Sequence, residues 1–140
     1  MQTINALVPE LAVKSYRVSR NFYLTILGFT LIYERSEEGF GFFALGASQI
    51  MLDQIGLGRD FGDTDGQLGR GVNFQIGLDA LDPLLERLKA NAIMPYLSPE
   101  TRWYRRDDVE IGQYQCVVAD PDGYLLRFVQ VLGTRPVTAS

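Results

Sequence analysis

Residues 120–128 read Asp-Pro-Asp-Gly-Tyr-Leu-Leu-Arg-Phe, a tight turn followed directly by an apolar run. Proline presets one backbone dihedral of such a turn and glycine permits a positive one, so Asp120 to Gly123 are typical of a hairpin connection. The runs Gln113 to Ala119 and Tyr124 to Leu132, on either side of the turn, are rich in apolar and β-branched residues. They predict two paired strands.

A strand and a helix precede this hairpin. Residues 72–78 alternate apolar and polar side chains, which predicts a strand. Asp82 is the expected cap of a helix that has Pro83 at its first position and ends at Asn91, with Asp79 as an alternative cap one turn earlier. The remaining predicted elements are a strand at 94–97 and a long irregular segment at 98–112.

The first half of the chain repeats this order of elements. Its predicted elements are a strand Ile4 to Val8 interrupted by Pro9, a helix Lys14 to Leu27 stopped by Gly28, and strands Phe29 to Arg35, Phe40 to Leu45 and Gln49 to Gln54. Glycine and aspartate dominate residues 56–71, which predicts a linker loop.

The chain therefore reads βαβββ twice within one α+β domain. We expect a first module at 1–55, the linker at 56–71, a second module at 72–132 and a tail at 133–140, together forming a curved mixed sheet with helices on its outer face. Sequence identity between the halves is faint, so a ferredoxin-like or other α+β sandwich remains an alternative.

Composition narrows the functional classes. With 140 residues, of which 46% are hydrophobic, the chain can bury a core without disulfides or metal. A net charge of -4 argues against nucleic acid as a partner and weakly favours cationic ligands. The chain has no basic leader and no long apolar run, so we expect no membrane association and a cytoplasmic location. Cys116 lies in an apolar run and is interpreted as a small buried hydrophobe.

Both ends of the chain resemble the vicinal oxygen chelate superfamily, which includes glyoxalases, extradiol dioxygenases, fosfomycin-resistance enzymes and bleomycin-resistance proteins. The opening resemblance is carried by Leu7-Val8-Pro9-Glu10-Leu11, Asn21-Phe22-Tyr23 and Ile26-Leu27-Gly28-Phe29. The closing one is carried by residues 120–128, and the approach through Trp103-Tyr104-Arg105-Arg106 and Gly112-Gln113 is similar to the bleomycin-resistance branch. This scaffold hosts both enzymes and pure binders.

The resemblance implies four strand positions at which enzymes of the superfamily hold a divalent metal with His, Gln or Glu. We place them at Val8, Met51, Asn73 and Arg127. These four side chains do not form an oxygen and imidazole site, and the fixed cation of Arg127 repels a metal ion. The sequence contains no histidine, the commonest general base. We therefore expect no metal, no cofactor and no catalytic residue.

Aromatic residues are the predicted ligand contacts. Trp103 and Tyr104 fall in the predicted irregular segment, where large aromatic residues are typical of binding sites. Phe40 and Phe42 share one face of a strand, and Phe43 and Leu45 share the other. The pattern does not decide which face lines a cavity, and a pure core role for these rings stands as an equal alternative.

Charged residues complete the candidate site. Asp53, Asp107 and Asp108 are candidate anionic contacts, although surface solvation explains the last two better. Arg127 is expected to pair internally with Asp53, or else to bind a carboxylate or phosphate of a ligand.

The bleomycin-resistance resemblance implies a homodimer whose chains exchange their N-terminal strands and enclose ligand crevices. Pro9 fits the hinge of such an exchange and equally fits an edge-strand proline. Our hypothesis is a non-catalytic homodimer that sequesters a bleomycin-like glycopeptide, a cationic and aromatic ligand. The alternatives are a metal-dependent lyase, dioxygenase or thiol transferase of the same fold, or a binder of another small ligand.

Overall fold

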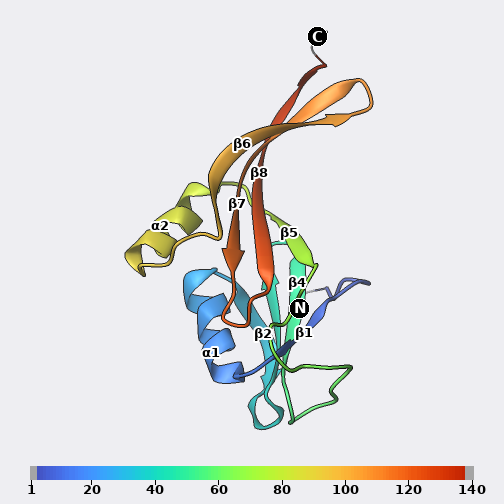
Figure 1. The fold of residues 1–140 in the computed structure, drawn as a ribbon, viewed down its shortest axis with the longest axis vertical. Helices are drawn as coiled ribbons and strands as arrows, with labels where there is room; N and C mark the ends of the chain where they lie inside the picture. The colour runs from blue at the N-terminus through green and yellow to red at the C-terminus, as the bar shows by residue number, and fades with distance from the viewer. Residues whose placement is uncertain (1–2, 138–140) are drawn as a thin grey trace. The chain divides into compact units, whose positions relative to one another are not determined.

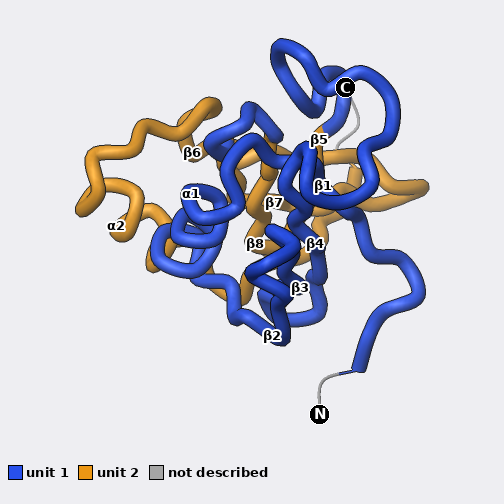
Figure 2. The backbone as a smooth tube through the Cα atoms, turned by 90° about the horizontal axis from the view of Figure 1, so that it is seen from below, with its two compact units in different colours: residues 1–72, 120–124 blue, residues 73–119, 125–140 orange. Residues whose placement is uncertain are grey.

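The computed structural model describes residues 3–137 and divides into two compact units (Figure 2). The first unit runs to Val72 and also contains the turn Asp120–Tyr124. The second unit contains Asn73–Ala119 and the chain from Leu125 onward. Residues 138–140 of the predicted tail lie outside the described part of the chain.

The first unit contains one βαβββ module (Figure 1). Its strands form a mixed sheet in the order β1-β4-β3-β2, in which only the β1 and β4 pair is parallel. The elements are β1 (Glu10–Val13), α1 (Tyr16–Asn21), the π-helix η1 (Phe22–Ile26), β2 (Thr30–Arg35), the 3-10 helix η2 (Ser36–Glu38), β3 (Phe40–Leu45) and β4 (Ser48–Gln54).

The second unit repeats this topology. Its sheet has the equivalent order β5-β8-β7-β6, again with one parallel pair, β5 and β8. The elements are β5 (Asn73–Gly77), α2 (Asp82–Ala90), β6 (Leu97–Arg106), β7 (Val109–Ala119) and β8 (Leu125–Pro136). The predicted α+β class and the two βαβββ modules are confirmed, as two four-stranded mixed sheets.

In the first unit, the helix-facing side of the sheet is identified by Phe43. Its ring lies 6.4 Å, centroid to centroid, from both Tyr16 of α1 and Tyr23 of η1. Side chains alternate between the two faces of a strand, so Phe40 and Phe42 lie on the opposite face. This answers the question of faces that the sequence pattern left open.

In the second unit, two hydrogen bonds identify the side that α2 covers. Tyr114 Oη donates to Asp82 Oδ1 at 3.4 Å, and Gln130 Oε1 accepts from the Leu81 backbone N–H at 2.9 Å. The even-numbered residues of β7 and β8 therefore face α2, and four of them are fully buried: Cys116, Val118, Leu126 and Phe128. Burial raises the pKa of the Cys116 thiol to about 11, which fits an inert core residue.

Two predicted strands are wrong. The first strand does not span Ile4 to Val8, because β1 begins at Glu10, directly after Pro9. Pro9 has no N–H to donate but its carbonyl accepts from Met51 N at 2.8 Å, so it stands at the entrance of the strand. The strand predicted at 94–97 is also misplaced, since β6 begins only at Leu97.

The predicted irregular segment at 98–112 is wrong as well. It forms the ladder between β6 and β7, closed by a turn in which Asp107 has a φ of 57°. Most of β6 is exposed on both sides, so it lacks the apolar alternation by which strands are recognised. β8 likewise continues to Pro136, beyond its predicted end at Leu132.

The predicted helices are present with smaller differences. The first continues from α1 into the π-helix and stops at Gly28, whose φ is 83°. Asp82 is not the cap of α2: it lies in the first turn, and the cap position belongs to Leu81. No helix within residues 3–137 is long and apolar enough to cross a membrane.

Candidate functional site

The face of the second unit opposite α2 carries several polar side chains, with Val117, Val129 and Val131 lying among them. Strand register places Gln115 of β7 opposite Glu100 of β6, and Arg127 of β8 opposite Gln75 of β5. We call this surface the glutamine face and define it by seven residues: Gln75, Glu100, Arg102, Tyr104, Gln113, Gln115 and Arg127.

Hydrogen bonds within the glutamine face fix the orientation of its side chains. Gln115 Nε2 donates to Tyr104 Oη at 2.6 Å and to Glu100 Oε1 at 3.2 Å. Arg127 Nη2 donates to Gln75 Oε1 at 2.8 Å. Both amide groups are thereby held in one orientation.

Three buried polar atoms of this face have no hydrogen-bond partner within residues 3–137. They are Gln113 Oε1, Gln115 Oε1 and Arg127 Nε. Gln115 is only 2% exposed, so its carbonyl is almost fully removed from solvent. A buried polar atom left unpaired costs about 1–3 kcal/mol, so each of these atoms calls for a hydrogen-bond partner. The face offers two hydrogen-bond acceptors and one donor.

Trp103 and Tyr104 are separated by the strand they share. Tyr104 belongs to the glutamine face, whereas Trp103 lies on the opposite side of β6, beside Gly112. The Arg135 guanidinium lies 4.1 Å from the centroid of the Trp103 ring. The expectation that both rings lie in an irregular loop is wrong, because neighbouring residues of a strand point to opposite faces.

Arg127 finds a partner within its own sheet, the side-chain carbonyl of Gln75. Asp53 belongs to the first unit, and the predicted pairing of the two charges stays a prediction. Asp107 and Asp108 form the exposed tip of the β6–β7 hairpin, where Arg105 Nε donates to the Asp107 carbonyl at 3.0 Å.

Asp53 lies beside two adjoining cavities of the first unit. One, of about 270 Å³, is lined among others by Glu10, Asp53, Asp60 and Tyr124. The other, of about 330 Å³, shares Glu10 and Asp53 and adds Phe40. Burial, reinforced by the charge of Asp60, raises the pKa of Asp53, and burial together with Asp53 raises that of Glu10.

Of the two phenylalanines expected to contact ligand, Phe40 lines the second of these cavities and Phe42 lines neither. Phe42 is 2% exposed and its ring stacks under Tyr33, with centroids 5.5 Å apart. Phe40 is itself covered by the Arg35 guanidinium, 4.1 Å from its ring centroid.

Strand register shows which residues lie opposite two of the four positions at which metal ligands were sought. The residue of β1 opposite Met51 is Glu10, not Val8, because the strand begins after Pro9. The residue of β5 opposite Arg127 is Gln75, not Asn73.

The side chains that the register brings together also fit a divalent metal poorly. In the first unit Glu10 faces a thioether. In the second unit the guanidinium of Arg127 occupies the oxygen of Gln75 that would bind the ion. Within residues 3–137, no group of three or more His, Cys, Asp or Glu side chains is arranged to hold a metal ion.

Sequence reasoning missed the residues at the centre of the glutamine face. Gln113 and Gln115 stand at alternate positions of a correctly predicted apolar strand. Two amides on the same side of a mostly buried strand are a signal that could have been used, because buried polar side chains require partners.

Comparison with known proteins identifies the family. Residues 3–128 match the family model described as the Glyoxalase/Bleomycin resistance protein/Dioxygenase superfamily. The chain belongs to this superfamily. A comparison with curated protein sequences finds no match.

Solved structures of this superfamily's fold cover nearly the whole chain. A virulence protein from Salmonella typhimurium is 18% identical, with 92% of this chain and 98% of that one covered and a TM-score of 0.67. Lactoylglutathione lyase from Agrobacterium tumefaciens is 17% identical, with 92% and 96% covered and a TM-score of 0.54. TioX from Micromonospora sp. ML1 is 17% identical, with 91% and 100% covered and a TM-score of 0.59. At these identities the likeness establishes the fold alone.

Proposed function

We propose that this chain is a non-catalytic binding protein that sequesters a bleomycin-like glycopeptide antibiotic, as a homodimer. The observation that carries the proposal is the glutamine face, with its buried and unpaired atoms of Gln113, Gln115 and Arg127. A peptide-like ligand presents N–H donors and carbonyl acceptors along its backbone, which match two acceptors and one donor. Binding such a ligand satisfies atoms that are otherwise buried at a cost.

Two further features support this ligand class. The cavities beside Asp53 and Glu10 carry more carboxylates than guanidinium groups, with Arg59 in both and Arg35 in one, and they suit the cationic groups of such an antibiotic; Tyr124 offers an aromatic wall. Tyr104, whose hydroxyl is fixed by Gln115, offers a ring at the edge of the glutamine face. The charged and aromatic residues that the sequence predicts as ligand contacts therefore lie in both units. Each unit has its own candidate contacts.

The side chains at the four metal positions favour a protein that binds the antibiotic without catalysing a reaction on it. Met51 and Arg127 replace oxygen or imidazole donors, and the chain has no histidine to act as a general base. The proposed mechanism of resistance is therefore mass action, in which the bound antibiotic is removed from its target and released unchanged.

The homodimer is part of the proposal. The segment before β1 crosses the side of β4 through its contacts with Gln49, whose Oε1 accepts from Asn5 N at 2.7 Å and whose Nε2 donates to Thr3 O at 2.6 Å. Exchange of this segment about Pro9 would preserve the same bonds in a partner chain. Sedimentation equilibrium tests it: a monomer at micromolar concentration rejects the dimer.

Calorimetric titration with bleomycin tests the function. We expect saturable binding, intact antibiotic by mass spectrometry after release, and about tenfold weaker binding for Gln115→Leu, the effect of losing one buried hydrogen bond. Trp103→Phe is the matched control, because Trp103 lies on the opposite side of β6 and should leave the affinity unchanged. Absence of heat at micromolar ligand rejects the antibiotic, and equal losses in both variants reject the glutamine face as its site.

A metal-dependent enzyme of the same fold is the second candidate, and one observation favours it. Strand register brings two oxygen donors, Glu10 and Gln75, opposite Met51 and Arg127. Metal analysis of protein purified without chelator distinguishes the candidates: stoichiometric metal that is lost in Glu10→Ala would replace the binding proposal by the enzymatic one.

A further inference from the structure

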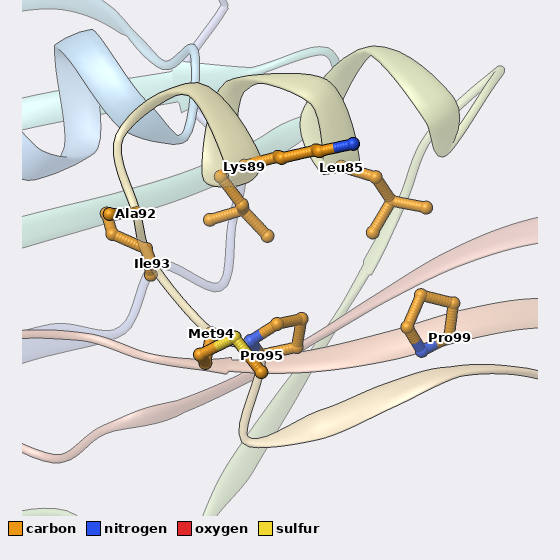
Figure 3. A pocket seen from close by; sticks show the side chains of 8 residues that line it. Leu85, Lys89, Ala92, Ile93, Met94, Pro95 and Pro99 are labelled. Carbon is orange, nitrogen blue, oxygen red and sulfur yellow. The ribbon is translucent and has the colours of Figure 1, made fainter.

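A pocket of about 380 Å³ lies on the α2 side of the second unit, away from the glutamine face (Figure 3). It opens between α2 and the segment that leads into β6. Its apolar walls are Leu85 and Leu88 of α2, Ile93, Met94 and Pro95 of the segment, and Pro99 of β6. A cavity of this size is within the range that holds a small ligand.

The part of the wall formed by Ala92 and Ile93 is held by backbone hydrogen bonds to α2. Ala92 N donates to Lys89 O at 3.1 Å and Ile93 N donates to Leu88 O at 2.9 Å, the two bonds of a Schellman motif. Ala92 occupies the left-handed position of this motif, with a φ of 55°, where glycine is the favoured residue. Its methyl group lines the pocket. An alanine is therefore present at a position where it strains the backbone, and its methyl group completes the apolar wall.

Lys89 is the only ionisable residue among those that line the pocket. Its aliphatic stem runs along the α2 side of the pocket toward Leu85 and ends in the ammonium group (Figure 3). No salt bridge within residues 3–137 involves this ammonium. The pocket therefore combines an apolar interior with one unpaired positive charge, the complement of an amphipathic anion.

Met94 is the residue at which such a ligand is expected to enter the pocket. Its side chain is 85% exposed although it is apolar, and Tyr96 beside it is 69% exposed. Methionine adapts its shape at binding surfaces because its side chain is flexible and polarizable. Large exposed apolar residues around a preformed cavity are typical of ligand entrances.

We propose that this pocket binds a medium-chain alkyl carboxylate, with the alkyl chain between α2 and residues 92–99 and the carboxylate against Lys89 Nζ. This site is independent of the glutamine face and of the antibiotic proposed above. The carboxylate, and not a neutral or cationic head group, follows from the sign of the one charge at the rim.

Methyl-labelled methionine makes the test site-specific. Of the three methionines, Met94 lines the pocket and Met51 lies in the first unit, so [methyl-¹³C]methionine protein titrated with octanoate should shift the Met94 resonance and leave that of Met51 unchanged. From hexanoate to octanoate, affinity should rise about fourfold for each added methylene, as expected when each one is buried. Octanol should bind more weakly than octanoate.

Lys89→Gln should remove the preference for octanoate over octanol while octanol still binds. The matched control is Lys14→Gln, which changes the other lysine of the chain and should keep the preference. The proposal is overturned if Met94 and Met51 shift together, if octanol and octanoate bind equally to the unmodified protein, or if the Met94 resonance shifts with protein concentration alone. The last result would identify the pocket as a contact between two copies of the chain.

Discussion

Tyr23 Oη donates a 2.8 Å hydrogen bond to Asp120 Oδ2, and 97 positions of sequence separate the two residues. Tyr23 is fully buried and Asp120 is 5% exposed. The other oxygen of Asp120 accepts from the backbone N–H groups of Asp122 and Tyr124, each at 2.9 Å. The two stretches that carry the family resemblance, one near each end of the chain, therefore meet in a single buried network of the first unit.

Loss of this contact should destabilise the fold. Tyr23→Phe removes a donor to a buried carboxylate and is expected to lower the free energy of unfolding by about 2 kcal/mol. Urea denaturation measures the change. Tyr96→Phe, the same substitution at an exposed side chain, should leave the midpoint unchanged, and equal effects in both variants would contradict a structural role for the bond.

The free energy of unfolding should decrease at low pH, because Glu34 becomes protonated there. Hydrogen bonds from Arg20, at 2.8 Å, and from Tyr16 lower the pKa of Glu34. A carboxylate whose folded pKa is depressed stabilises the fold above its unfolded pKa and loses that contribution as pH falls. Glu34→Gln should therefore be less stable than the parent at pH 7, and urea titrations should show the deficit shrinking toward pH 3. A deficit independent of pH would contradict this account; Glu37→Gln, an exposed neighbour on η2, is the control.

Asp53 should have the opposite effect on the pH dependence of stability, and should make the fold less stable as the pH rises. Burial and the neighbouring charges of Asp60 and Glu38 raise its pKa, while Arg35 lowers it. Because the folded carboxyl holds its proton more tightly than the unfolded one, its contribution is present at low pH and is lost as pH rises through the raised range.

Asp53→Asn cannot titrate and should exceed the parent protein in stability at pH 7, with the gain disappearing toward pH 3. Urea midpoints across this range measure it. Asp65→Asn, in the exposed loop, should give no such trend, and a gain that grows at low pH would reverse the assigned sign.

The close contact between Trp103 and Gly112 can be tested by adding a methyl group at Gly112, with the same change at Gly77 as the control. An added methyl at Gly112 would lie 2.7 Å from the Trp103 ring, whereas one at Gly77 meets nothing within 4 Å. Gly112→Ala should destabilise by about 1–3 kcal/mol and alter Trp103 fluorescence as the ring leaves Arg135. Gly77→Ala should change neither quantity; unaltered emission in Gly112→Ala would contradict the contact.

Much of the fold was predictable because apolar periodicity and turn chemistry act locally. The Asp120–Gly123 turn, the stop at Gly28 and the strand Phe40–Leu45 all have a local physical cause that is visible in the residues. Strand β6 was not predictable, since most of its residues are exposed and it lacks the apolar alternation that marks a strand; it is a strand because it pairs with β7.

The candidate site was predictable only in part. Arg127 and Tyr104 were chosen for their chemistry and share the glutamine face, whereas Trp103 was grouped with Tyr104 because both fell in a presumed loop. A strand instead sends adjacent side chains to opposite faces. Gln113 and Gln115 were identified through their buried unpaired atoms, and Gln75 through its hydrogen bond to Arg127; both observations depend on the tertiary fold.

The two hydrogen bonds that hold the Gln115 amide suggest how the ligand preference of this face can change during evolution. Tyr104 Oη and Glu100 Oε1 hold the amide nitrogen, so the buried carbonyl oxygen is left as the free acceptor. Replacing these two neighbours by groups that only donate hydrogen bonds would rotate the amide and exchange an acceptor for a donor, with Gln115 itself untouched. A scaffold of this kind can acquire a new specificity from the second layer of side chains while the residue in contact with the ligand stays constant.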